Sequence, residues 1–86
     1  MHKSLTMKIE VLFFGITADI AKEKSIQLEI EEGVSVEKLR ILLQVKYPNL
    51  SNYKNFSVAV NMEYASDDVV LKIGDSVALI PPVSGG

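Results

Sequence analysis

The sequence predicts a small α+β domain in which one main helix packs on one face of a mixed sheet. Two segments with alternating apolar residues stand before a helical stripe of leucines, and further strand-like segments follow it. The chain of 86 residues is long enough for a single domain with one modest core. The fold class therefore follows from the order of the elements along the chain.

The first two strands are expected to form a hairpin. Residues 7–14 alternate between apolar and other side chains, and residues 25–31 do so strictly, with charged or polar residues facing water. Gly15 breaks the first strand, and residues 16–24 have room for a short helix or turn. Because this connection is short, antiparallel pairing of the two strands is the natural outcome.

The main helix is expected directly after Ser35, whose hydroxyl can accept a hydrogen bond from a free backbone N–H of the first turn. Apolar residues at helical spacing predict a stripe that faces the sheet: Val36, Leu39, Leu42 and Leu43. Ile41 and Val45 lie outside this stripe, and we expect them to pack under the following loop. The helix should end before Tyr47-Pro48, because a residue that precedes proline resists the α conformation.

The second half of the chain predicts further strands. Residues 49–55 are polar and loop-like, residues 56–61 form the next strand, and residues 63–68 form a polar connection with a short edge strand. The last strand covers residues 76–80 and stops at Pro81-Pro82, because proline offers no N–H to a ladder. This order is that of the β-grasp arrangement, in which the last strand lies in the centre, parallel to the first.

Composition excludes several classes of function. The formal charge is −2, and the basic residues are scattered singly, so no stripe is present that would bind nucleic acid. The chain has no cysteine, and its one histidine, His2, has no partner that would complete a metal site. No secretory signal or stretch of roughly 20 apolar residues is present, so we expect no membrane association and a cytoplasmic location.

The C-terminal residues are the most specific feature of the sequence. We expect an N-terminal extension over residues 1–6 that is disordered, a β-grasp domain over residues 7–80, and an extended tail over residues 81–86. A tail of this length reaches at most about 20 Å. Proline stiffens its root, and two glycines at its tip remove side-chain bulk. The tail is therefore suited to insertion into a partner's active site through these residues: Pro81, Pro82, Val83, Ser84 and Gly85.

The Gly86 carboxylate is the expected reactive group of this tail. A carboxylate is a poor acyl donor until a leaving group is attached, and adenylation by ATP provides one. A sulfur nucleophile can then form a thiocarboxylate. Because the chain has no cysteine, a sulfur atom that it carries must reside on the backbone terminus.

An apolar patch is expected beside the tail. Leu12 and Phe14 on the first strand, like Ala78 and Ile80 on the last, lie opposite the side chains that face the core. If the two strands are neighbours, these four residues form one patch on the helix-free face. Unless a loop covers it, we expect the patch to be the interface with the protein that receives the tail.

Over residues 7–86 the sequence resembles the MoaD family, the small sulfur-carrier subunits of molybdopterin synthase. The markers are Val11-Leu12-Phe13-Phe14, Val60-Asn61, and the closing run from Gly74 to Gly86, which is the most specific of the three. The resemblance implies a ubiquitin-like β-grasp fold. It also implies a carrier that is not an enzyme on its own and binds no cofactor.

The same resemblance implies a set of partners. An E1-like adenylyltransferase would consume ATP to adenylate Gly86, and a sulfur donor protein would provide the sulfur of the thiocarboxylate. The tail would enter the large subunit of a heterotetrameric molybdopterin synthase. There it would donate sulfur to cyclic pyranopterin monophosphate in molybdenum cofactor biosynthesis. Phe14 and Ile80 match positions of partner contact in the family, in which an aromatic residue also occurs at the position of Ile80.

Three hypotheses are open at this point. The chain is a sulfur carrier for molybdopterin, a related carrier for thiamine or tRNA thiolation or a ubiquitin-like modifier of lysines, or an interaction domain with an inert tail. An independent enzyme is the least favoured, because paired carboxylates, a Ser-His constellation and a glycine-rich phosphate loop are all missing from the sequence.

Overall fold

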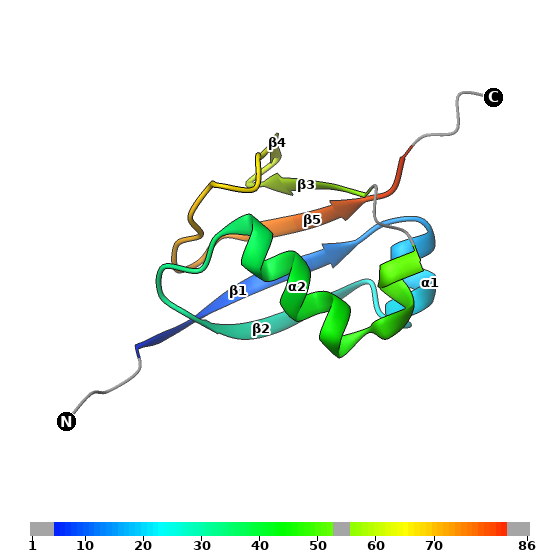
Figure 1. The fold of residues 1–86 in the computed structure, drawn as a ribbon, viewed down its shortest axis with the longest axis horizontal. Coiled ribbons are helices and arrows are strands. Elements are labelled where there is room, and N and C mark those ends of the chain that lie inside the picture. Colours follow the sequence, from blue (N-terminus) through cyan, green and yellow to red (C-terminus); the bar gives the residue numbers. More distant parts are fainter. Residues whose placement is uncertain (1–4, 53–55, 83–86) are drawn as a thin grey trace.

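The computed structural model describes residues 5–52 and 56–82. Its elements, in chain order, are β1 (Thr6–Phe13), α1 (Ile16–Ala21), β2 (Ser25–Glu31), α2 (Val36–Lys46), the 3-10 helix η1 (Pro48–Asn52), β3 (Ser57–Val60), β4 (Glu63–Tyr64) and β5 (Ser76–Ile80). The strands form one sheet in the order β2-β1-β5-β3-β4, and α2 crosses one face of it (Figure 1). The predicted α+β fold of the β-grasp type is confirmed.

The centre of the sheet is the pair β1 and β5, which run parallel, as the sequence predicts. Strand β1 also pairs with β2 in the expected antiparallel hairpin, and β5 pairs antiparallel with β3 on its other side. Alternate residues of β1 point under α2 and are buried: Met7, Ile9, Val11 and Phe13. Since α2 covers this face of the sheet, the opposite face of β1 and β5 is free of helices (Figure 1).

Strand β1 begins one residue earlier than expected. Thr6 pairs with Glu31 at the end of β2. The backbone N–H of Glu32 donates a 3.0 Å hydrogen bond to the carbonyl oxygen of Leu5. Leu5 and Thr6 therefore belong to the hairpin and not to the extension expected over residues 1–6, of which residues 1–4 lie outside the described part of the chain.

Helix α2 has the predicted cap and the predicted end, but a narrower buried stripe. Ser35 Oγ accepts a hydrogen bond from the backbone N–H of Lys38 at 3.2 Å, and the helix ends at Lys46. Its fully buried residues are Val36, Leu39 and Leu43. Leu42 is 36% exposed because it sits at the side of the stripe, so its assignment to the core face was wrong.

The two residues that we expected to pack under the loop after α2 are exposed instead. Ile41 and Val45 are 49% and 75% exposed. The chain after the helix does not fold back over them, because it forms η1, whose Leu50 is fully buried. The expected polar loop over residues 49–55 therefore contributes to the core, and its residues 53–55 lie outside the described part.

The turn between β3 and β4 explains why Asn61 stands out in the sequence. Asn61 has a positive φ of 51°, a conformation that asparagine tolerates better than most residues. Its Oδ1 accepts a hydrogen bond from the backbone N–H of Ser76 at 3.0 Å, and its Nδ2 donates to Asp75 Oδ1 at 2.9 Å. These bonds hold the turn against the start of β5.

No helix in the described part of the chain has the length and apolar character that a membrane span requires.

Candidate functional site

The sheet register brings the four predicted patch residues together. Leu12 pairs with Ala78 in the parallel β1–β5 ladder, and Ser57 of β3 pairs with Ile80. The backbone N–H of Phe14 lies 3.3 Å from the carbonyl oxygen of Leu79, so Phe14 extends the same ladder. As a result, one groove of about 410 Å³ on the helix-free face is lined by residues that include Leu12, Phe14, Ala78 and Ile80.

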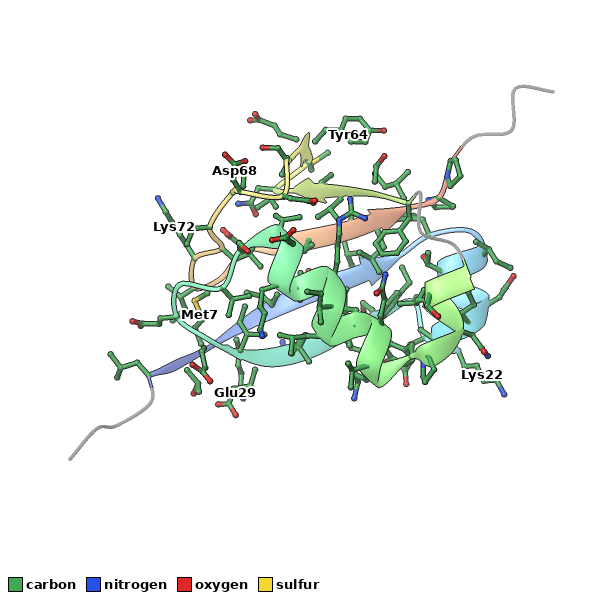
Figure 2. The ribbon with its side chains drawn as sticks, in the orientation of Figure 1. Met7, Lys22, Glu29, Tyr64, Asp68 and Lys72 are labelled. Carbon is green, nitrogen blue, oxygen red and sulfur yellow. The ribbon has the colours of Figure 1, made fainter. Side chains whose placement is uncertain are left out.

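The groove is wider than the sequence predicts. Ala59, Met62, Tyr64 and Ser76 complete its lining. Tyr64 pairs with Ala59 across the β3–β4 ladder, which places both side chains on the groove side of the sheet. Figure 2 shows Tyr64 at the β4 edge of the sheet, opposite the β2 edge that carries Glu29. The sequence does not indicate that Met62 and Tyr64 belong to the groove. Tyr64 lies on a strand of two residues and Met62 in the turn before it, and neither segment is long enough to show alternation.

Large apolar side chains of the groove are open to solvent. Phe14 is 49% exposed, Tyr64 75% and Met62 97%. Leu12, Ala78 and Ile80 are half-buried and form the lower part of the groove. No segment among residues 5–52 and 56–82 covers them. An uncovered apolar face of this kind on a small domain is typical of a protein interface.

The root of the tail lies next to the groove. Strand β5 ends at Ile80, and the half-buried Pro81 follows directly. Its ring packs on the backbone of Gly15, where a Cβ atom would lie only 2.9 Å from Pro81 Cγ. Pro82 is exposed. The remaining predicted tail residues lie outside the described part: Val83, Ser84, Gly85 and Gly86.

The described residues contain no group of three or more His, Cys, Asp or Glu side chains that could hold a metal ion. His2 lies outside them. The exposed apolar lining of the groove supports docking of a partner beside the root of the tail.

A β-grasp domain with an uncovered groove beside the end of its last strand places the chain in the class of ubiquitin-like proteins. A family model narrows this class: it matches residues 11–86, and the chain belongs to the ThiS family.

Known proteins similar to this chain match it over nearly its whole length. The molybdopterin synthase sulfur carrier subunit of Mycobacterium tuberculosis is 38% identical over 82 residues, which cover 93% of this chain and 99% of that protein. In the complex of subunits 1 and 2 of the molybdopterin-converting factor from Helicobacter pylori, one chain is 32% identical with a TM-score of 0.67, covering 93% of this chain and 100% of that chain. SAMP1 from Haloferax volcanii has a TM-score of 0.80 at 26% identity, covering 92% of this chain and 99% of that chain.

Proposed function

We propose that this chain is the sulfur-carrier subunit of a molybdopterin synthase and is not an enzyme on its own. The observation that carries the proposal is the 38% identity, over nearly the full length of both chains, to the Mycobacterium tuberculosis sulfur carrier subunit. The groove beside Pro81 agrees with it, because a carrier must dock on a partner while its terminus enters that partner's active site.

The proposed chemistry takes place on the Gly86 carboxylate. In an E1-like adenylyltransferase, the carboxylate oxygen attacks the α-phosphorus of ATP, and pyrophosphate leaves. Sulfide delivered by a sulfur donor protein then attacks the acyl carbon, AMP leaves with the bonding electron pair, and a thiocarboxylate remains. The carrier binds no cofactor in this scheme, since ATP is a substrate of the activating enzyme. We place these steps in the cytoplasm, where ATP and reduced sulfur are at hand.

The proposed acceptor of the sulfur is cyclic pyranopterin monophosphate, bound to a large subunit in a heterotetramer. The Helicobacter pylori structure, a complex of subunits 1 and 2, supports a large-subunit partner. The groove lined by Phe14 and Ile80 is the surface that we assign to this contact. It is apolar and stands at the end of the sheet from which the tail departs, so docking there brings the tail close to the partner.

The test is a mass measurement on the full chain. After incubation with ATP, the activating enzyme and a sulfur donor, a thiocarboxylate adds about 16 Da, the difference between sulfur and oxygen. Met62 is 97% exposed, and its oxidation to the sulfoxide adds nearly the same mass. The mass gain must therefore be located in the C-terminal peptide after proteolysis. A chain without Gly86 should show no gain there, and no gain in the intact chain would overturn the proposal.

A second candidate function is that of a ubiquitin-like modifier joined to lysines. The likeness to SAMP1 favours it, because SAMP1 stands for small archaeal modifier protein 1. Both functions begin with adenylation, so they separate at the next step: a modifier forms an isopeptide bond to a lysine, whereas the carrier yields a dithiolene. A carrier for thiamine or tRNA thiolation would be recognised by the thiolated product.

A further inference from the structure

Thr17 is the one fully buried polar side chain among residues 5–52 and 56–82. It lies in the first turn of α1, directly after the end of β1. Burial of a hydroxyl is costly unless hydrogen bonds compensate for the lost water. The partners of this hydroxyl therefore indicate what Thr17 contributes.

Thr17 Oγ1 joins the end of β1 to the end of β5. It accepts a hydrogen bond from the backbone N–H of Phe14 at 2.9 Å and donates to the carbonyl oxygen of the same residue at 2.6 Å. The carbonyl oxygen of Leu79 lies within 3.4 Å, as a second acceptor for the single hydroxyl proton. The two short bonds hold Phe14, a groove residue, against the start of α1, and the longer contact with Leu79 places the same hydroxyl beside the end of β5.

The turn that Thr17 closes also supports the tail. Gly15 lies between Phe14 and α1 and has a φ of +56°, which glycine adopts without strain. This conformation places its backbone directly against the ring of Pro81. The φ of Pro81 is fixed by its ring, and its ψ is restricted to the extended region because Pro82 follows, so the contact on this ring sets the direction in which the chain continues. The positions of Phe14 and Pro81 are therefore coupled through one short turn.

We propose that Thr17 is a positioning residue for sulfur transfer: by fixing the turn at Phe14 and Gly15, it sets the direction of the tail relative to the docked groove. The inference rests on the proposed carrier function. Once the groove is bound to the large subunit, the tail must already point towards the reacting atom of the substrate. Misplacement of a reacting group by about 1 Å can cost on the order of a hundredfold in rate.

The test separates docking from transfer. Thiocarboxylate forms of each variant, prepared by sulfide cleavage of an intein fusion so that activation plays no part, are mixed with the large subunit and the pterin substrate. The Kd for the large subunit and the single-turnover transfer rate at saturation are measured. Thr17→Val keeps the shape of the side chain but makes no hydrogen bonds. It should lower the saturating rate about tenfold and weaken the Kd by a clearly smaller factor than Phe14→Ala does, because the Phe14 side chain is retained.

Two further variants complete the design. Thr17→Ser retains the hydroxyl and should restore most of the rate. Phe14→Ala should show the reverse pattern, with a weaker Kd and a nearly unchanged saturating rate. If Thr17→Val proves too unstable to measure, Pro81→Ala tests the same coupling from the tail side, because it frees the φ of the tail root. It should then reproduce the loss of rate with little change in Kd.

The outcomes that would overturn the inference are specific. An unchanged saturating rate in Thr17→Val, or in Pro81→Ala where that variant replaces it, would show that the turn does not position the tail. Equal losses in Thr17→Val and Thr17→Ser would assign the effect to packing and not to the hydroxyl. If the wild-type thiocarboxylate transfers no sulfur, the proposed function itself fails, and the inference fails with it.

Discussion

Leu12 and Ala78 lie directly opposite each other in the parallel ladder of β1 and β5. On the helix-free face of β1, the residues before Leu12 are polar or charged, whereas Leu12 and the following Phe14 are apolar. The pairing with Ala78 therefore joins the apolar end of β1 to the apolar face of β5. Because alanine is small, the floor between Leu12 and Ala59 stays low, and the neighbouring side chains enclose a groove.

The first prediction concerns this floor. Ala78→Leu adds three carbon atoms on the side that faces the groove and away from the core. We expect the affinity for the large subunit to fall at least about tenfold, because the bulk fills the space for the partner's side chains. The melting temperature should change little, since the added atoms do not enter the packed core. Unchanged affinity, measured by calorimetry, would mean that the partner docks elsewhere.

The second prediction places a charge in the groove. Phe14→Asp should weaken binding of the large subunit strongly, because an unpaired carboxylate would be buried in an apolar interface. Since Phe14 is 49% exposed in the free protein, the loss of stability should be small. Ile73→Asp is the matched control, because Ile73 is 77% exposed and does not line the groove. A large drop in the melting temperature of Phe14→Asp would instead show a core role.

The third prediction compares two leucines of α2 that have the same spacing signal in the sequence. Leu39 is fully buried and Leu42 is 36% exposed. Leu39→Ala should therefore lower the free energy of unfolding by about 2–5 kcal/mol, through the lost contacts and the cavity that remains. Leu42→Ala should cost less than about 1 kcal/mol, in part because alanine favours the helix. Denaturant unfolding measures both, and equal losses would contradict the burial in the structure.

The sequence predicts best where the physical signal is local and repeated. Strict alternation in residues 25–31 defines β2 to the residue, and the crossover through α2 predicts the parallel contact of β1 with β5. Which residues of α2 face the sheet is harder to predict, because Leu42 lies at the border of the apolar stripe. Leu50 is missed because it is a single apolar residue in a polar run, and its burial depends on the path of the chain after the helix.

The same reasoning explains what was predicted of the groove. Leu12, Phe14, Ala78 and Ile80 lie on two strands with clear alternation, so neighbouring strands suffice to bring them together. Tyr64 and its neighbour Met62 reach the groove through a tight turn and a two-residue strand. Their placement depends on hydrogen bonds of Asn61 to residues that lie more than ten positions away in the sequence.

The last prediction tests that turn. Asn61→Ala removes the side-chain hydrogen bonds to Ser76 and Asp75. Alanine also tolerates the φ of 51° less well than asparagine, because it has no polar side chain that can bond locally. Each lost hydrogen bond costs about 0.5–1.5 kcal/mol, and the left-handed conformation costs a further 1–2 kcal/mol, roughly. Asn61→Gly loses the same bonds but adopts the conformation freely. The alanine variant should therefore be the less stable of the two in denaturant unfolding.

The turn also carries groove residues, so the two variants should differ in function as well. Both remove the side-chain bonds that tie the β3–β4 turn to the start of β5 and keep the backbone bond from residue 61 to the carbonyl oxygen of Ser76, so Met62 and Tyr64 are held less firmly at the edge of the groove. We expect each variant to bind the large subunit more weakly, with the glycine variant affected at least as much because its turn is more flexible. Full affinity in both would show that the edge formed by Met62 and Tyr64 does not contact the partner, and would confine the interface to β1 and β5.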